Sequence, residues 1–181
     1  MKGMIILVDG FEDIETIVPI DLIRRGKIRI DTVSLTNEKM VKSKSRIVYS
    51  VDYLLEEIDA IDYDFLIIPG GPAVSNYHLQ SPVTKQLVKI FQKDKKLIAA
   101  ICAAPSILGE LGLLDNEQFV CFPGFEEYSP NGIYQENAKV IISDNHITSK
   151  AAGTAFEFAY EIIKYLKGEQ FANNILNSVY Y

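Results

Sequence analysis

The sequence predicts an α/β fold, a three-layer sandwich in which a mostly parallel β-sheet has helices on both faces. Short apolar runs of the length of buried strands alternate with segments in which apolar residues recur at helical spacing. This alternation is typical of parallel strands with helices packed on both sides of the sheet. With 181 residues, 48% of them hydrophobic, the chain can form one compact domain over residues 1–181.

The N-terminal third contains two predicted strands and one predicted helix. Met4–Val8 is a continuous apolar run, typical of a buried parallel strand. A helix is predicted from about Glu12 to Arg25, and Ile28–Leu35 alternates between apolar and polar residues as a second strand does. Residues 39–62 have a weaker pattern, which predicts a short hairpin around Ile47–Tyr49 and one helical turn.

Two strand–helix pairs are predicted in the middle of the chain. Phe65–Ile68 is a buried strand that ends at a glycine pair. Ser81 and Pro82 supply an N-cap and a first-turn proline for the next helix. Leu97–Ile101 is the following buried strand, and Ser106–Leu114 is predicted to be helical.

The C-terminal third continues the alternation of strands and helices. Thr154 and Glu157 match a capping box, which predicts a helix that runs to about Leu166. The other predicted elements are three strands and a last helix, at Gln118–Cys121, Lys139–Ile142, His146–Ser149 and Glu169–Ser178. Together these elements predict a flavodoxin-like sandwich.

Composition excludes several classes of protein. The net charge is −6, from 18 basic and 24 acidic residues, which argues against a nucleic-acid-binding surface. No apolar run approaches the roughly 18 residues of a membrane span, and the N-terminus lacks a secretory signal pattern. The two cysteines do not make a disulfide scaffold, and there is no metal-spaced Cys/His cluster, P-loop or GxGxxG motif. We expect a cytoplasmic protein with reduced thiols, no metal, no cofactor and no membrane or nucleic-acid partner.

Three predicted strands end in residues that can do chemistry. The first is followed by an acidic segment that ends at Glu15, the third by Gly70 and Gly71, and the fourth by Cys102. Open α/β sheets bind ligands at the carboxyl ends of their strands. If these strands are neighbours, an acid, a glycine turn and a thiol meet in one crevice.

Cys102 is the strongest candidate nucleophile. It stands where a strand turns into a helix, and helix N–H groups there favour thiolate and lower the pKa of the thiol. The small neighbours Ala103 and Ala104 suit a tight turn. The alternative is that Cys102 is a small buried hydrophobe, which is the interpretation we prefer for Cys121.

Glu15 and the glycine pair are the candidate partners of this thiol. Pro19 has no N–H and cannot bond to the Glu15 carbonyl, so the helix start is irregular, a hint of a constrained site. Alternatively, Glu15 only favours the helix N-terminus. Gly70 and Gly71 permit close approach of a ligand, and their N–H groups could stabilise an oxyanion with that of Ala103. A plain turn is the other interpretation of the glycine pair.

The two histidines are weaker candidates. His78 falls in a predicted surface loop and His146 at a predicted turn. Neither adjoins Cys102 in the sequence, so a Cys–His dyad would have to form through space.

Four segments together resemble the ThiJ/PfpI superfamily. GFEDIETIVPIDLIRRG, LIIPGG, LIAAICAAPSIL and ITSKAAGTAFEFA occur in the order expected of that superfamily. The nearest branch is that of the Parkinsonism-associated protein deglycase, and the resemblance covers essentially the whole chain. It implies a flavodoxin-like sandwich with a nucleophile elbow, and a homodimer to whose interface the first helix contributes.

The resemblance also implies roles for individual residues. Cys102 matches the reactive, easily oxidised cysteine of the elbow. Glu15 matches an acid that is protonated and hydrogen-bonds to the thiolate. Gly71 and Ala103 match positions whose backbone N–H groups line the oxyanion site.

Around the pocket, the resemblance is less complete. Arg25 and Arg46 match basic residues near the pocket, and Gly70 adjoins it. The deglycase branch has a histidine where this chain has Phe122, and protease-like members have one where this chain has Ala103. Peptide hydrolysis is therefore not expected.

Two main functions remain open from the sequence. In the first, Cys102 of a glyoxalase III or deglycase-type enzyme adds to a small 2-oxoaldehyde such as methylglyoxal, and Glu15 moves protons. In the second, a redox-sensing or oxidative-stress protein, Cys102 oxidises to a sulfinate without substrate turnover. A third function, as a hydrolase or amidase, requires His78 to reach the thiol.

Overall fold

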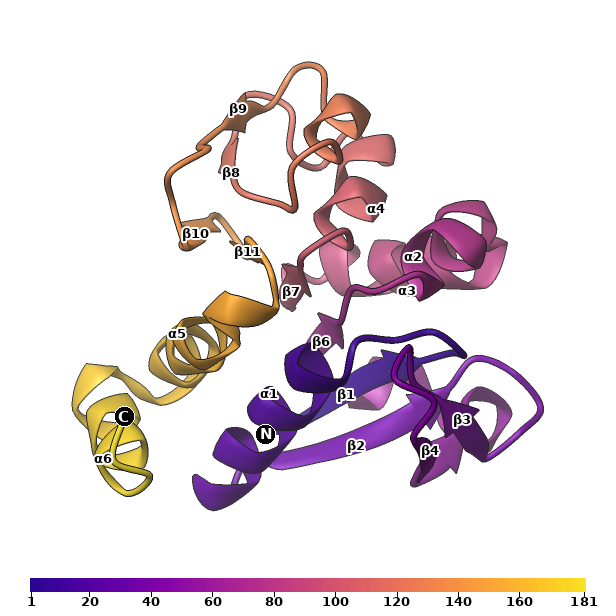
Figure 1. Ribbon diagram of the computed structural model, residues 1–181, viewed down its shortest axis with the longest axis vertical. Coiled ribbons are helices and arrows are strands. Elements are labelled where there is room, and N and C mark those ends of the chain that lie inside the picture. The colour runs from indigo at the N-terminus through magenta and orange to yellow at the C-terminus, as the bar shows by residue number, and fades with distance from the viewer.

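A seven-stranded sheet forms the centre of the molecule. The computed structural model describes residues 1–181, and the strand order is β10-β11-β7-β6-β1-β2-β5 (Figure 1). The strands are β1 (Lys2–Leu7), β2 (Arg29–Ser34), β5 (Tyr53–Leu54), β6 (Phe65–Ile68), β7 (Leu97–Ile101), β10 (Val140–Ser143) and β11 (His146–Ser149). All neighbours are parallel except β10 and β11. The central order β2-β1-β6-β7-β11 is the flavodoxin-like order, so the predicted fold class is confirmed.

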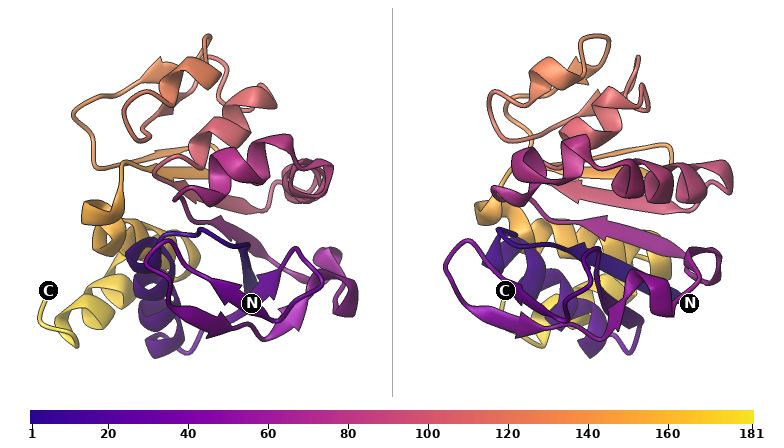
Figure 2. Two further views of the ribbon diagram at one scale, coloured as in Figure 1. Left: turned by 45° about the vertical axis from the view of Figure 1, so that its right-hand side comes forward. Right: turned by 90° about the vertical axis from the view of Figure 1, so that its right-hand side faces the viewer.

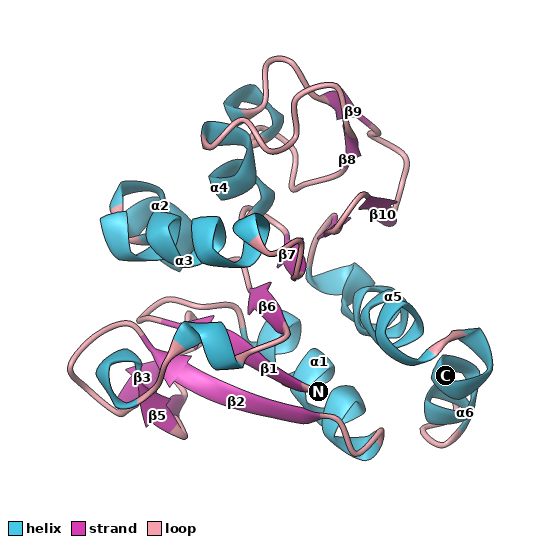
Figure 3. Ribbon diagram, turned by 180° about the vertical axis from the view of Figure 1, so that it is seen from behind, coloured by secondary structure: helices cyan, strands magenta, loops and turns pink.

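Helices cover both faces of this sheet. One face carries α1, α5 and α6, and the other carries α2, α3 and α4 (Figures 2 and 3). The helices are α1 (Asp13–Arg25), α2 (Ala73–Asn76), α3 (Pro82–Lys93), α4 (Pro105–Glu110), α5 (Ala155–Lys167) and α6 (Glu169–Asn177). None of them has the combination of length and apolar character needed to cross a membrane.

The three central strands are apolar because both of their faces are covered. Every residue of β6 and β7 is buried, as are five of the six residues of β1. Gly3 in β1 makes room for a neighbour, since a Cβ there would lie 2.0 Å from the ring of Phe65. These continuous apolar runs were predicted as buried parallel strands, and the sheet confirms them.

Two small sheets lie outside the main one. The predicted hairpin is present as β3 (Met40–Lys42) and β4 (Val48–Ser50), which pair antiparallel. The strand expected at Gln118–Cys121 is shorter than predicted: β8 (Gln118–Phe119) pairs with β9 (Ile133–Tyr134) in a separate sheet. The ladder stops there because the Val120 N–H donates to the side chain of Thr148 at 3.1 Å.

The predicted capping box before α5 does not form. The Thr154 hydroxyl donates to the Ala151 carbonyl at 2.7 Å and closes a short 3₁₀ turn, Ala152–Thr154. Glu157 pairs with Lys139 instead of reaching back to the helix start. The helix therefore begins with a turn that faces the ends of the neighbouring strands.

Candidate active site

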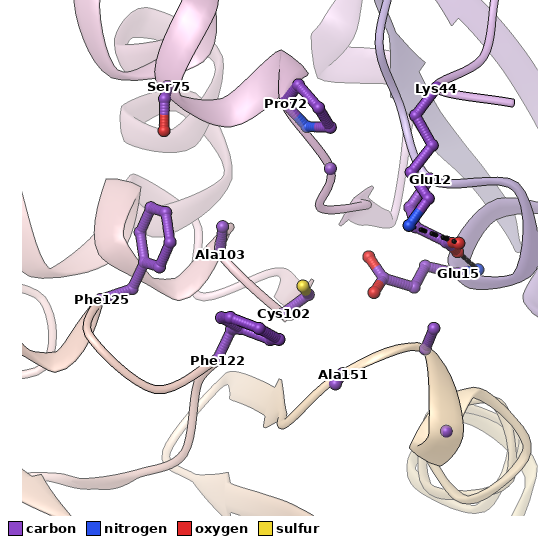
Figure 4. A pocket seen from close by; sticks show the side chains of 13 residues that line it. Glu12, Glu15, Lys44, Pro72, Ser75, Cys102, Ala103, Phe122, Phe125 and Ala151 are labelled. Atoms are coloured by element: carbon purple, nitrogen blue, oxygen red, sulfur yellow. Dashed lines mark hydrogen bonds and ion pairs between the residues drawn. The ribbon is translucent and has the colours of Figure 1, made fainter. Parts of the chain in front are cut away.

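The carboxyl ends of β1, β6 and β7 meet at one edge of the sheet. The neighbours of β1 are β2 on one side and β6 on the other, so the chain order reverses between β1 and β6, where ligands bind in this fold. The loops are tied together, since the Glu12 N–H donates to the Gly70 carbonyl at 3.1 Å and the Ala73 N–H to the Gly10 carbonyl at 3.2 Å. The predicted convergence of acid, glycine turn and thiol is present (Figure 4).

A pocket of ≈ 350 Å³ opens at this edge. Five of the residues singled out from the sequence line it, namely Cys102, Glu15, Gly71, Ala103 and Phe122. The remaining lining residues are Glu12, Lys44, Pro72, Ser75, Phe125, Ala151, Ala152 and Gly153.

Cys102 occupies a strained turn between β7 and α4. Its φ is 65°, in the left-handed region that residues other than glycine rarely adopt. The turn is fixed on both sides, because the Cys102 N–H donates to the Ser149 carbonyl at 2.9 Å and the Cys102 carbonyl accepts from the Phe122 N–H at 2.7 Å. The surrounding structure thus holds a conformation that costs energy, as is typical of functional sites.

The glycine pair is required by close approach. A Cβ on Gly70 would lie 2.6 Å from both the Cys102 Cβ and Glu15 Oε2. Gly71 has a φ of 91°, and a Cβ there would lie 2.5 Å from the Gly10 carbonyl oxygen. No side chain fits at either position, so this turn is more than a plain chain reversal.

Glu15 is fully buried beside the thiol. Its Oε2 accepts a hydrogen bond from the Gly70 N–H at 2.8 Å, whereas Oε1 has no partner, and Figure 4 shows the carboxyl group facing Cys102. The pKa of Glu15 is raised from 4.5 to about 7: burial is the largest cause, the nearby charge of Glu12 also raises it, and the Cys102 thiol and the Gly70 N–H lower it. Glu15 therefore exchanges its proton near neutral pH, as a proton shuttle must.

Glu12 and Lys44 form a second charged layer behind Glu15. Glu12 Oε2 accepts from the Glu15 N–H at 2.9 Å, which caps α1 and fixes the position of Glu15. Lys44 Nζ, from the turn between β3 and β4, lies 3.4 Å from Glu12 Oε1. The positive charge of Lys44 lowers the pKa of Glu15.

The lowered thiol pKa expected for Cys102 is wrong. Burial raises the pKa of this thiol, and the charge and hydrogen bond of Glu15 raise it further, whereas the backbone N–H groups of Ala103 and Gly71 lower it. The helix that follows has only six residues, Pro105–Glu110, so its field is too weak to outweigh burial. Cys102 and Glu15 interact closely enough to titrate as a pair, and the repulsion disappears when Glu15 is neutral.

Both histidines lie outside the pocket lining. His78 is almost fully buried, its Nδ1 lies 3.0 Å from Thr84 Oγ1, and burial lowers its pKa to about 4. The surface loop predicted around His78 is thus a buried 3₁₀ turn. His146 pairs with Ile98 at the opposite end of β7, about 13 Å along the strand from Cys102. The hydrolase interpretation therefore lacks its base.

The two arginines named from the resemblance are also outside the lining. Arg25 pairs with Asp21 at 2.8 Å on the surface of α1. Arg46 is exposed in the turn of the β3–β4 hairpin, with a φ of 67°. Lys44, two residues earlier in that turn, supplies the basic side chain at the pocket.

Sequence reasoning missed several lining residues. Phe125 follows Phe122 in the loop after Cys121. The one signal that could have identified it is its place beside Phe122 in the aromatic segment CFPGF. Lys44 and Ser75 carried no signal, because hairpin and turn residues reach the pocket through tertiary packing. No group of three or more potential metal ligands occurs in the structure.

Fold and site together define an α/β protein that carries a cysteine at a strand-to-helix turn of the nucleophile-elbow type. The model of the DJ-1/PfpI family matches residues 1–165, and the chain belongs to this family, as its four sequence motifs predicted. A glutathione-independent glyoxalase of Caenorhabditis elegans is 36% identical over 97% of this chain and 94% of the relative. A deglycase of Pyrococcus abyssi is 27% identical over 92% of this chain and 100% of the relative. The structure of oxidized Toxoplasma gondii DJ-1 covers 99% of this chain and 98% of that chain, at 29% identity and a TM-score of 0.92.

Proposed function

We propose that this protein is a cysteine-dependent enzyme of the glyoxalase III or deglycase type that acts on small 2-oxoaldehydes such as methylglyoxal. One observation carries the proposal: the pocket places the Cys102 thiol beside a buried acid, Glu15, whose pKa is about 7. The names glyoxalase and deglycase in relatives support the same reaction class.

The reaction balances with the groups in the pocket. The Cys102 sulfur adds to the aldehyde carbon, its proton goes to the new oxygen, and the N–H groups of Gly71 and Ala103 stabilise the developing negative charge. Glu15 then takes the hydrogen from this carbon as a proton and returns it to the neighbouring carbonyl carbon, while the proton of the new hydroxyl group passes to the oxygen of that carbonyl. The product is a thioester of lactate, and water hydrolyses it to lactate and the free thiol.

This mechanism has no histidine beside the thiol. Phe122 stands where the deglycase branch has a histidine, so no imidazole assists the proton transfers. A positioned acid or base contributes a rate factor of roughly 10²–10⁴, which Glu15 must supply without help. The pKa of Glu15 near neutrality is what suits it to this double role.

The test is methylglyoxal consumption, with lactate detected as product. Wild-type protein is expected to turn over, and Cys102→Ala is expected to lose turnover entirely. Cys121→Ala is the matched control, because it removes the other thiol, which is fully buried in the core. Equal rates for wild type and Cys102→Ala would reject the proposal.

A second function, redox sensing, has an observation of its own. Glu15 Oε1 is buried without a hydrogen-bond partner, and Figure 4 shows the carboxyl group facing Cys102, so the neutral acid can donate a hydrogen bond to a sulfinate at this position. Mild peroxide is then expected to oxidise Cys102 in preference to Cys121. Mass spectrometry tests this, and preferential oxidation at Cys121 would reject it.

We also propose that the protein works as a homodimer through α1. Ile14 and Ile17 of this helix are 49% and 40% exposed, an apolar surface that a second copy would cover. Light scattering at micromolar concentration tests this. A monomer for the wild type would reject it.

A further inference from the structure

The pocket is larger and more apolar on one side than methylglyoxal needs. Its volume of ≈ 350 Å³ is within the range of sites that enclose far larger ligands, roughly 300–1,000 Å³. Methylglyoxal, a three-carbon compound, would leave most of this space to water. The surplus volume has room for a larger substituent on the reacting carbonyl group.

Charged and aromatic groups lie on opposite sides of the sulfur. Figure 4 shows Glu15, with Glu12 and Lys44 behind it, on one side of Cys102. Phe122 and Phe125 lie on the other side. The two halves of the pocket thus differ in the chemistry that they can bind.

The aromatic side is pre-formed for an apolar group. Phe122 keeps 45% of its surface exposed although it lines the pocket, so a ring face is available to a ligand. Its backbone is held by the hydrogen bond of 2.7 Å from its own N–H to the Cys102 carbonyl. Phe125 stands on the same loop, and its ring stacks on Tyr128 with centroids 6.1 Å apart. Aromatic rings in a pocket bind other aromatic rings in stacked or edge-to-face geometry.

The reaction geometry fixes which way the substituent points. The aldehyde carbon must sit at the Cys102 sulfur, with its oxygen toward the N–H groups of Gly71 and Ala103. Glu15 must reach the hydrogen on that carbon from its own side. The substituent on the neighbouring carbonyl then extends away from Glu15, toward Phe122 and Phe125.

We propose that the site is selective for 2-oxoaldehydes with an aryl substituent, held by Phe122 and Phe125, over methylglyoxal. This inference rests on the proposed function. With phenylglyoxal as the representative, Cys102 adds to the aldehyde carbon and the hydrogen of that carbon moves to the ketone carbon. The aldehyde carbon is thereby oxidised and the ketone carbon reduced, and water releases mandelate from the thioester.

The experiment compares kcat/KM for phenylglyoxal and methylglyoxal, with mandelate and lactate as detected products. Phenylglyoxal also modifies arginine, so the rate with Cys102→Ala protein is subtracted from each value. A single methylene in an apolar pocket changes kcat/KM by about 10-fold or more. The kcat/KM of wild type is therefore expected to be at least about 10-fold higher for phenylglyoxal than for methylglyoxal.

Variants assign this preference to the ring of Phe122. Phe122→Ala is expected to lower the phenylglyoxal-to-methylglyoxal ratio about 10-fold, and Phe122→Leu, which keeps apolar volume, by a smaller factor. Tyr165→Leu is the control, because this aromatic residue on α5 is 45% exposed and is not among the residues lining the pocket. Its ratio is expected to equal that of wild type.

Binding separates failure of this inference from failure of the proposed function. Cys102→Ala protein is titrated calorimetrically with 2-hydroxyacetophenone and with hydroxyacetone, which lack the aldehyde. Tighter binding of the aryl compound, lost in Cys102→Ala/Phe122→Ala, supports the aryl site even if neither aldehyde turns over. Turnover of both aldehydes with equal kcat/KM overturns the aryl site and leaves the proposed function standing. If neither aldehyde turns over and the aryl compound does not bind more tightly, both the aryl site and the proposed function are overturned.

Discussion

The two cysteines of this chain show how surroundings, and not residue type, determine what a thiol can do. Cys102 is half-buried at the floor of a pocket, in a left-handed turn, with an acid and two backbone N–H groups around its sulfur. Cys121 is fully buried in the apolar core, and burial raises its pKa to about 12. Burial raises both pKa values, but only Cys102 has a neighbour that exchanges a proton near neutral pH.

The largest expected difference is in alkylation. Iodoacetamide reaches Cys102 through the pocket, whereas Cys121 reacts only after the core opens. If opening of the core around Cys121 costs about 4 kcal/mol, Cys102 is labelled about 1,000-fold faster than Cys121. Mass spectrometry of the native protein at pH 7 measures the two rates. In guanidinium chloride the two rates are expected to converge, and similar rates in the native state would contradict the comparison.

Two glycine substitutions sharpen the comparison, because each adds one Cβ in a different region. In Gly70→Ala the Cβ would lie 2.6 Å from the Cys102 Cβ and from Glu15 Oε2, so the thiol and the acid are displaced. Displacement of about 1 Å at a reacting centre costs about 100-fold, which is the expected loss in kcat/KM for methylglyoxal.

Gly3→Ala is the matched change in the core. Its Cβ would lie 2.0 Å from the Phe65 ring, which costs about 1–3 kcal/mol in the free energy of unfolding. The folded protein is expected to keep the wild-type kcat/KM for methylglyoxal. Urea denaturation and turnover by the folded protein measure the two effects, and a lowered kcat/KM in Gly3→Ala would show that the two regions are not independent.

Glu15→Gln tests the acid that distinguishes the two thiols. The pKa of Glu15 is about 7 in the folded state against 4.5 unperturbed, so the folded state binds the proton more tightly. The stability from this group is full below about pH 4.5 and is lost as the pH rises through about 7. The amide does not titrate, so between pH 4.5 and pH 8 its stability relative to wild type is expected to rise by about 3 kcal/mol.

Urea denaturation of both proteins at pH 5 and pH 8 measures this difference. The pH 5 comparison serves as the control for any change in packing, since the wild-type acid is mostly neutral there. A stability difference that does not change with pH would mean that Glu15 is ionised in the folded state throughout this range.

The fold was predictable because its signal is local. Met4–Val8, Phe65–Ile68 and Leu97–Ile101 are covered on both faces, and burial on both faces leaves a continuous apolar run in the sequence. The carboxyl ends of such strands share one edge of a parallel sheet. Cys102 and the glycine pair could therefore be assigned to one site without knowledge of side-chain positions.

What could not be predicted depends on tertiary packing. The thiol pKa of Cys102 follows from its depth and from Glu15 across the sheet, not from its place before a helix. The basic side chain of the pocket is Lys44 because the β3–β4 turn brings that residue to the pocket, and Arg46 two residues on stays exposed. Thr154 matched a capping pattern, but its hydroxyl donates a hydrogen bond to the Ala151 carbonyl instead.

The smallest expected effect is that of Lys44, which lines the pocket and pairs with Glu12, on the pKa of Glu15. Lys44→Met removes the cation 3.4 Å from Glu12 Oε1, so the negative charge of Glu12 acts on Glu15 without compensation and the pKa of Glu15 rises. Because the Lys44 side chain is 45% exposed, screening by water keeps the rise small. The pH dependence of Cys102 alkylation reports it as a shift of the inflection near pH 7 to higher pH. Lys42→Met, in the same hairpin but outside the pocket lining, is expected to leave the inflection in place, and equal shifts in both variants would mean that only net charge is sensed.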